Sequence, residues 1–288
     1  MRAVDVLIQG VLVGGLYTLF ATGLSLTFGV MRLVNLAHGD LIVLAAYMGI
    51  VVTQALGLSP FASLLVVVPA MAALGYALQR LLLNRTLGAD PLPPLLVTFG
   101  LSIVIQNALL EGFTADDRKL SIGALATRSV TLPGGIAVGW FPLIVLACAV
   151  AVIALLQVVL YRTAWGAALR ATSDDPVTVR LMGVDQRHMY ALAMAVALAV
   201  CGVAGVLLAC WTNVDPGAGP QRLLYGFEAV IIGGLGSLWG TLAGGLILGI
   251  AQAAGAAIDP AFQILAGHLA FLLVLLVAPR GLLPRMAA

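Results

Sequence analysis

The sequence predicts an all-α polytopic membrane protein with about eight transmembrane helices and one further segment that either crosses or re-enters the membrane. Of its 288 residues, 62% are hydrophobic and 9% are charged, whereas soluble domains are about 45–50% apolar and about 25% charged. Seven stretches of 20 to 39 residues carry no charged side chain. A helix needs about 20 apolar residues to cross a bilayer, and a charge at its centre costs about 2.5–3.5 kcal/mol. The alternating pattern of a membrane barrel is absent, so the spans are helices.

The charge-free stretches place each element in turn. The longest stretch is divided at Gly57-Leu58-Ser59-Pro60, a turn sequence, and therefore supplies two helices. We expect the first stretch to be a membrane helix and not a cleaved signal peptide. It is preceded by Asp5 instead of a basic cluster, and no cleavage pattern follows it. The expected spans are 6–29, 39–56, 60–82, 94–111, 139–161, 189–211, 241–258 and 262–278, and the shorter segment is 224–238.

Residues 1–288 are expected to form a single transmembrane domain with two aqueous segments, an extracytoplasmic loop at 112–138 and a cytoplasmic segment at 162–187. The excess of basic residues on cytoplasmic loops sets orientation. Nine basic residues fall on one predicted side and five on the other. The larger set, which includes Arg285, indicates a cytoplasmic C-terminus. The larger set is Arg32, Arg80, Arg85, Arg162, Arg170, Arg180, Arg187, Arg280 and Arg285; the smaller is Arg2, Arg118, Lys119, Arg128 and Arg222.

Several classes of protein are excluded by what the sequence lacks. The net charge of +2 leaves no basic stripe for nucleic acid. The three cysteines, Cys148, Cys201 and Cys210, lie in apolar runs without ligand spacing, so we expect them to pack and to hold no metal. No phosphate-binding loop, HExxH motif or complete nucleophile elbow occurs. We therefore expect no catalytic residue, cofactor or metal, and a protein that is not an enzyme.

Glycines in the apolar stretches fall into two kinds. Gly10 and Gly14 are four residues apart, as are Gly240 and Gly244 and also Gly245 and Gly249, a spacing that lets helix backbones approach closely. The run that contains Gly233, Gly234 and Gly236 is denser and weakens a helix by about 1 kcal/mol per glycine. It is either a break within the membrane that lines a solute pathway or a plain loop between two helices.

A second interruption lies at 34–40, where polar or flexible residues separate two apolar runs. Asn35 is expected to cap the following helix, and Asp40 to lie in its first turn. The segment is either an interfacial turn or a discontinuous helix end that offers Asn35 and His38 to a polar solute. Glu228 is an embedded acid that either faces the same pathway or lies at the interface.

The cytoplasmic segment contains the signals of a short helix. Asp175 is a good N-cap, Pro176 suits the first helical position and Gly183 suits the C-terminal cap. Val177 and Leu181 lie on one face of about two turns. Because so short a helix is marginal in water, it needs a partner, either this chain's own helix ends or a separate soluble subunit.

These motifs together resemble the permease subunits of high-affinity branched-chain amino-acid ABC importers, the LivH type. The resemblance covers almost the whole chain and is strongest at Gly-Leu-Tyr-Thr-Leu, Gly-Leu-Ser-Leu-Thr-Phe-Gly-Val-Met, Asn-Leu-Ala-His-Gly and Ala-Tyr-Met-Gly (15–19, 23–31, 35–39 and 46–49). Further blocks are 97–102, 168–175 with 181–184, 227–240 and 278–283. The chain departs from the family at Leu36, often Phe, at Asp40, often Glu, and at 176–179, usually alanines.

The resemblance implies a multi-pass protein of the bacterial inner membrane. Its implied partners are a second permease subunit, two ATP-binding cassette ATPase subunits, an extracytoplasmic solute-binding protein and the lipid bilayer, with no nucleic acid. The implied substrate-pathway residues are Asn35, His38, Asp40, Glu228, Gly233, Gly234 and Gly236. The implied ATPase-coupling residues are Arg170, Asp174, Asp175, Val177, Arg180, Leu181 and Gly183.

Other readings stay open at this point. The same machinery could carry urea, short-chain amides or aromatic acids instead of branched-chain amino acids. An ion-coupled secondary transporter would need an embedded acid, for which Glu228, Asp40 and Glu111 are available.

Overall fold

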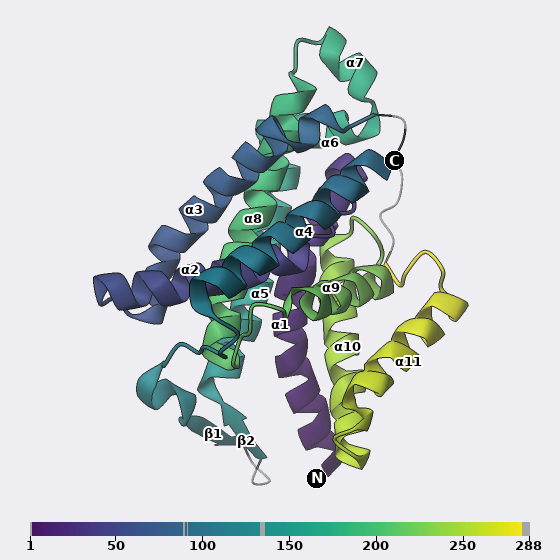
Figure 1. The fold of residues 1–288 in the computed structure, drawn as a ribbon. Coiled ribbons are helices and arrows are strands. Elements are labelled where there is room, and N and C mark those ends of the chain that lie inside the picture. The colour runs from purple at the N-terminus through teal and green to yellow at the C-terminus, as the bar shows by residue number, and fades with distance from the viewer. Residues whose placement is uncertain (1, 89, 91, 133–135, 284–288) are drawn as a thin grey trace.

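Each charge-free stretch contains a long helix in the computed structural model of the chain, which describes residues 2–88, 90, 92–132 and 136–283 (Figure 1). Arg285 and residues 133–135 of the predicted loop lie outside the described residues. Within these described residues, seven helices are long and apolar enough to cross a membrane. They are α1 (Arg2–Met31), α2 (His38–Leu56), α3 (Pro60–Leu81), α4 (Leu92–Phe113), α5 (Trp140–Arg162), α8 (Gln186–Trp211) and α10 (Leu238–Ile258).

An eighth apolar helix, α11 (Phe262–Val277), is 16 residues long. The prediction of an all-α polytopic membrane protein with about eight spans is therefore confirmed. The shorter segment is α9 (Gly219–Gly233), which begins five residues before the predicted start and has 15 residues. At 1.5 Å per residue it is about 22 Å long, less than the roughly 30 Å of a bilayer core.

Smaller elements lie outside the long helices. The predicted loop contains the 3₁₀ helix η2 (Gly123–Ala126) and an antiparallel hairpin of β1 (Ser129–Leu132) and β2 (Ile136–Gly139). The predicted cytoplasmic segment contains α6 (Ala164–Asp174), which we did not expect, and α7 (Pro176–Leu181), which we did. A second 3₁₀ helix, η1 (Leu83–Arg85), follows α3. In Figure 1, α6 and α7 lie at one end of the molecule, opposite the hairpin and the N-terminus.

Helices α1, α2 and α8 form the centre of the bundle and are buried over half or more of their apolar windows, whereas α3, α4 and α5 are buried over only 22–28% of theirs. Leu65 of α3 and Leu276 of α11 are 80% and 85% exposed. A helix that is apolar on its exposed side is stable when lipid covers that side. The outer helices therefore supply the lipid-facing surface.

Glycines bring α1 and α10 into backbone contact, as their spacing predicted. A Cβ added to Gly14 would lie 2.7 Å from the carbonyl oxygen of Gly245, and one added to Gly249 would lie 2.3 Å from that of Gly10. We call this contact of Gly10, Gly14, Gly245 and Gly249 the glycine seam. Gly244 makes a similar approach to α9, where a Cβ would lie 2.0 Å from the Ala229 carbonyl oxygen.

Candidate functional site

Helix α2 begins deep inside the bundle. The His38 side chain, in the first turn of α2, contacts the Phe20 carbonyl oxygen through Nε2 at 2.9 Å. Phe20 lies 11 residues before the end of α1, which is about 17 Å along its axis. The chain therefore leaves α1 at Met31 and returns to this depth through the non-helical residues 32–37 before α2 starts. Non-helical backbone at such depth is tolerated only where protein or a polar pathway surrounds it.

Asn35 and His38 hold this start in place. The Asn35 side-chain oxygen accepts a hydrogen bond from the Ala37 amide at 3.1 Å, and the Asn35 carbonyl accepts one from the His38 amide at 3.2 Å. The N-cap of α2 is Ala37 and no side chain caps it, so the prediction that Asn35 caps the helix is wrong; Asn35 instead stabilises the turn that precedes α2. The His38 ring also lies 3.7 Å from the sulfur of Cys201, near the middle of α8. The side chains of Asn35 and His38 are buried, with 2% and 1% of their surface exposed.

Asp40 joins three helices at the same depth. It lies in the first turn of α2, as predicted, and its Oδ1 accepts a hydrogen bond from Gln106 Nε2 of α4 at 2.9 Å. A Cβ added to Gly219 would fall on the Asp40 carboxylate, so the N-terminus of α9 touches the acid directly. The positive end of a helix dipole stabilises a carboxylate so placed. Gln106 is half-buried and also donates to Ser102 at 3.2 Å.

Glu228 is buried in α9 and pairs with His268 of α11. Its second oxygen, Oε2, has no hydrogen-bond partner among the described residues. Gln252 of α10 accepts a 2.5 Å hydrogen bond from the Tyr17 hydroxyl, and its buried Nε2 likewise has no partner within that part of the chain. A buried polar atom without a partner is costly, so these atoms mark a place where water or solute would be stabilised.

The glycine run forms the turn between α9 and α10. Gly233 ends α9, and Gly234 and Gly236 have φ of 108° and 78°, a region that favours glycine. A Cβ on Gly29 would lie 3.1 Å from the Cα of Gly236, so the turn is level with the last turn of α1 and not with His38. The C-terminal stretch folds onto it, since the Leu282 amide donates to the Ile232 carbonyl at 2.9 Å.

Helix α7 has the ends that the sequence predicted. The Asp175 side chain accepts hydrogen bonds from the amides of Val177 and Thr178, each at 3.1 Å. Hydrogen bonds from the Thr178 hydroxyl and amide hold the pKa of Asp175 below its usual value, which keeps the cap ionised. The C-cap is Met182, and Gly183 follows with φ of 83°.

The outer face of α7 is apolar and uncovered. Val177, Leu181 and Met182 are 70%, 85% and 77% exposed, whereas Val179 packs inward. Arg180 is exposed on the same short helix. Exposed apolar side chains gathered on a two-turn helix are typical of a surface that another protein covers.

Helix α6 connects this surface to the bundle. Arg170 contacts the Leu160 carbonyl at the end of α5, and its guanidinium lies 4.6 Å from the centroid of the Tyr161 ring. Ser173 donates to the Gly29 carbonyl of α1 at 2.8 Å. Asp174 ends the helix. A movement of α7 would therefore be transmitted through α6 to α1 and α5.

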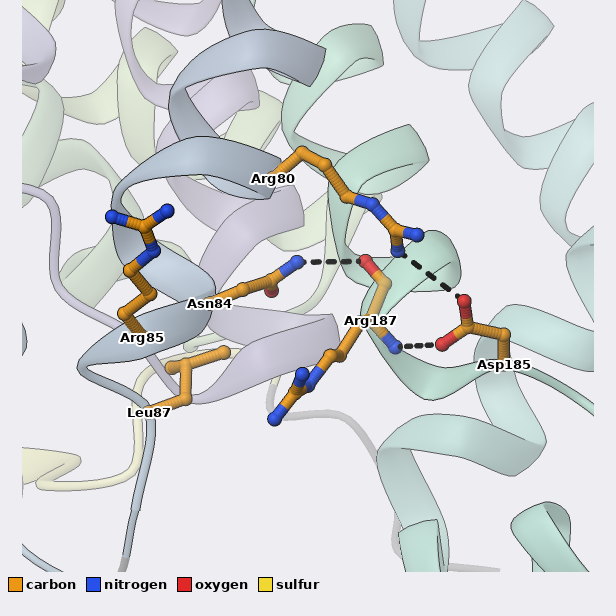
Figure 2. Close-up of a pocket in the computed structure, with 6 residues that line it drawn as sticks. All are labelled: Arg80, Asn84, Arg85, Leu87, Asp185 and Arg187. Atoms are coloured by element: carbon orange, nitrogen blue, oxygen red, sulfur yellow. Dashed lines mark hydrogen bonds and ion pairs between the residues drawn. The ribbon is translucent and has the colours of Figure 1, made fainter.

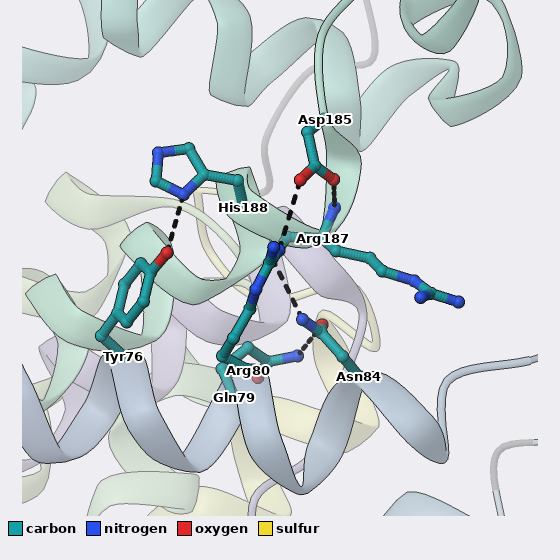
Figure 3. Close-up of polar contacts among 7 residues, drawn as sticks. All are labelled: Tyr76, Gln79, Arg80, Asn84, Asp185, Arg187 and His188. Carbon is teal, nitrogen blue, oxygen red and sulfur yellow. Dashed lines mark hydrogen bonds and ion pairs between the residues drawn. The ribbon is translucent and has the colours of Figure 1, made fainter.

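A polar cluster holds α3 and α8 together beside α7 (Figure 3). Arg80 forms an ion pair with Asp185 at 3.2 Å, and Asn84 donates to the Arg187 carbonyl at 3.2 Å. Tyr76 and His188 are linked by a hydrogen bond of 3.0 Å between the Tyr76 hydroxyl and Nδ1. Of these residues, Arg80, Asn84, Asp185 and Arg187 also border a cavity of about 520 Å³ (Figure 2).

Sequence reasoning placed Asn35, His38 and Asp40 together because they are close in sequence. It missed Gln106 as the partner of Asp40, His268 as the partner of Glu228, and Tyr17 as the partner of Gln252. These pairs are separated by 66, 40 and 235 residues. A single sequence carries no signal for such pairings beyond the presence of polar residues in apolar stretches. No group of three or more potential metal ligands occurs within the described residues.

Comparison with known proteins gives a consistent family. The family described as "Branched-chain amino acid transport system / permease component" matches residues 6–278. The high-affinity branched-chain amino acid transport system permease protein BraD of Pseudomonas aeruginosa is 29% identical, over 97% of this chain and 95% of its own. LivH of Escherichia coli strain K12, of the same description, is 28% identical over 96% and 94%.

Two further similarities are to a permease that is named for another solute and to a solved structure. The fructose import permease protein FrcC of Rhizobium meliloti is 30% identical, over 85% of this chain and 68% of its own. Among solved structures, a chain of PsaBC from Streptococcus pneumoniae in complex with Fab superimposes with a TM-score of 0.50 at 13% identity, covering 94% of this chain and 91% of that one. At that identity the structural match concerns the fold alone.

Proposed function

The chain belongs to the permease family of branched-chain amino-acid transport systems, and from this premise we propose that it moves branched-chain amino acids through a path beside the start of α2. It is the membrane permease component of an ABC transport system and lies in a membrane as a multi-pass protein. The resemblance inferred from the sequence motifs is thereby confirmed. We expect it to have no catalytic activity of its own and to reside in the bacterial inner membrane.

The observation that carries the proposal is the position of Asp40. Its carboxylate lies deep in the bundle, between the first turns of α2 and α9, and half-buried Gln106 covers it from α4. An amino acid is a zwitterion that cannot enter hydrocarbon unaided, and it needs polar contacts that are weak enough to release it. Asp40 can meet the ammonium group, and the N-terminus of α9 can meet the carboxylate.

The other proposed pathway residues lie at different positions relative to Asp40. Asn35 and His38 fix the start of α2 and are themselves buried. Glu228 lies farther along α9, and its Oε2 has no hydrogen-bond partner among the described residues. Gly233, Gly234 and Gly236 form the turn between α9 and α10, which is level with the end of α1 and not with Asp40, so they would line a different part of the path.

The partners follow from the family and from α7. We propose that a second permease completes the pathway, that a solute-binding protein delivers the amino acid, and that two ATPase subunits dock on the cytoplasmic face, with α7 as the docking helix of this chain. Val177, Leu181 and Arg180 would contact the ATPase, Asp175 and Gly183 would shape the helix, and Arg170 and Asp174 would connect it to the bundle. Residues 162–187 and the C-terminus would then be cytoplasmic, residues 112–138 extracytoplasmic, and residues 1–288 one permease domain.

The test is ATP-driven uptake by proteoliposomes that contain the complete transport complex. We expect accumulation of labelled leucine and none of labelled fructose. Fructose uptake without leucine uptake would contradict the proposed solute and favour the function in the name of FrcC. Uptake by this chain alone, driven by an ion gradient, would contradict the role of the ATPases.

A matched pair of variants tests the path itself. Gln106 contacts Asp40, whereas its neighbour Asn107 is exposed on the other side of α4 and bonds to the Ile103 carbonyl of its own helix. We expect Gln106→Leu to lower leucine uptake about tenfold, because it removes a hydrogen bond to a charged group worth about 1.5 kcal/mol. Asn107→Leu should leave uptake unchanged. Equal effects of the two substitutions would contradict the location of the path.

A further inference from the structure

We propose that the cavity between η1, the end of α3 and the start of α8 binds a phosphate monoester or diester, and that in the membrane this is the headgroup of an anionic phospholipid. The cavity has a volume of about 520 Å³ and is lined by Arg80, Asn84, Arg85, Leu87, Asp185 and Arg187 (Figure 2). The inference does not depend on which solute the permease carries.

The lining carries an excess of positive charge. Three arginines, Arg80, Arg85 and Arg187, face one acid, Asp185. Asp185 is already engaged, since it accepts a hydrogen bond from Arg80 at 3.2 Å and from the Arg187 amide at 2.9 Å. The guanidinium groups of Arg85 and Arg187 make no hydrogen bond or ion pair within the part of the chain that the structure describes. Two cations at one cavity are therefore available to an anion.

Neighbouring groups add to this charge. A second cavity of about 580 Å³ shares Asn84, Leu87 and Arg187 with the first and adds Arg180. Helix α8 begins at Gln186, so the positive end of its dipole faces the same region. Arginine matches the geometry of a phosphate through paired hydrogen bonds, which makes phosphate the anion that this lining suits best.

The position of the cavity favours a lipid as the source of the phosphate. The end of α3 beside Arg80 carries Leu81 and Leu82, which are 63% and 38% exposed, and Leu65 and Val66 of the same helix are 80% and 41% exposed. Of these, Leu81 and Leu82 adjoin the cavity, while Leu65 and Val66 lie farther along α3, and acyl chains would cover such exposed apolar side chains. A headgroup at the cavity and acyl chains along α3 would thus occupy adjoining surfaces. Basic cavities between helices at a membrane surface are known to suit anionic headgroups.

The experiment is native mass spectrometry of the full chain, purified with its partners and titrated with phosphatidylglycerol or phosphatidylcholine of equal acyl chains. We expect phosphatidylglycerol to bind more tightly. The double variant Arg85→Gln with Arg187→Gln should bind it about 30-fold more weakly, as expected for two basic side chains at a membrane surface. Asp185→Asn should bind it about fivefold more tightly, because it removes the only acid among the described residues of the lining.

The control is Arg128→Gln with Arg162→Gln, which also removes two exposed arginines but away from the cavity. It should bind phosphatidylglycerol as the parent does. A thermal midpoint equal to that of the parent shows that each double variant is folded. If the double variant Arg85→Gln with Arg187→Gln does not fold, the two single variants Arg85→Gln and Arg187→Gln are titrated in its place.

Further measurements distinguish a lipid headgroup from a soluble phosphate ester, and both from a protein-docking surface. Displacement of phosphatidylglycerol by millimolar glycerol 3-phosphate would assign the site to a soluble phosphate ester, and failure to displace it would assign the site to the lipid. Equal binding of the two lipids, or equal weakening by the control, would overturn the proposal. Loss of the ATPase subunits from the double variant with lipid binding unchanged would also overturn it and make the arginines a protein-docking surface. Because the readout is lipid binding and not leucine uptake, failure of the proposed function leaves these outcomes unaffected.

Discussion

Glycines serve opposite purposes in the glycine seam and in the segment that contains α7. In the seam, atoms of the facing helix fill every position where a side chain would project, as at Gly249, where a Cβ would lie 2.3 Å from the Gly10 carbonyl oxygen. At Gly183 no atom lies within 4 Å of an added Cβ, and the residue is present for its φ of 83°. The seam gains stability from close approach, whereas the α7 segment leaves its apolar face exposed.

The contrast extends to the helices themselves. Helices α1 and α10 are 30 and 21 residues long and bury their glycine faces against each other. Helix α7 has six residues, and Val177 and Leu181 are 70% and 85% exposed. A helix so short is not stable in isolation. Its caps and its connection to α6 hold it in a conformation that a partner can bind.

The largest effect is expected in the seam. Gly249→Ala places a methyl group against the backbone of Gly10 and Gly14, which neither helix can avoid by a side-chain movement. We expect a loss of about 1–3 kcal/mol or more in the free energy of unfolding, measured as a lower thermal midpoint in detergent. The control is Gly100→Ala in α4, where nothing lies within 4 Å of the added methyl. It should raise stability by up to about 1 kcal/mol, and a destabilisation equal to that of Gly249→Ala would remove the distinction.

A smaller effect on stability, but a specific effect on coupling, is expected at Gly183. Gly183→Val forces a branched residue to positive φ, which costs about 1–2 kcal/mol locally and displaces the end of α7. Gly183→Asn is the matched variant, because asparagine tolerates this conformation. ATP hydrolysis that drives leucine uptake should fall with valine and be retained with asparagine. Equal coupling in both variants would show that the backbone conformation at Gly183 does not matter.

The smallest effect is expected at Asp185, on the border of the α7 segment. Desolvation raises the pKa of Asp185, but hydrogen bonds from Arg80 and from the His188 and Arg187 amides, with the Arg80 charge, outweigh it, so the pKa is lowered overall. A carboxylate with a lowered pKa stabilises the fold above its unfolded pKa, and this stabilisation is lost as pH falls through the folded value.

Asp185→Asn keeps an N-cap residue and removes only the charge. The Arg80–Asp185 pair is exposed, 43% and 56%, so the difference in stability at pH 7 should be about 0–1 kcal/mol. Thermal midpoints of parent and variant should converge as pH falls below about 4. A difference that persists in acid would assign the effect to packing and not to charge.

The comparison also shows what one sequence can predict. The long helices follow from the absence of charge, and the ends of α7 follow from Asp175 and Pro176, because these signals are local. The seam was predicted as close packing from Gly10, Gly14, Gly245 and Gly249, although their partners were not. Local chemistry does not state which helix a glycine faces.

Depth and pairing could not be predicted for a related reason. The polar start of α2 was identified, but its position beside Phe20 depends on how residues 32–37 fold back along α1. The contact of Asp40 with Gln106 joins residues 66 positions apart. Helix α6 escaped prediction because it is short and its stability comes from contacts such as that of Ser173 with Gly29. These features arise from tertiary packing, which overrides local propensity.

The most direct test of the contrast is the double variant Val177→Asp with Leu181→Asp in the tagged full chain, purified from its native membrane. Both side chains are exposed, so the thermal midpoint of the chain should equal that of the parent. The ATPase subunits that accompany the parent should be absent, and ATP-driven leucine uptake should be lost. Retention of the ATPase subunits together with normal uptake would contradict the assignment of α7 as the docking surface.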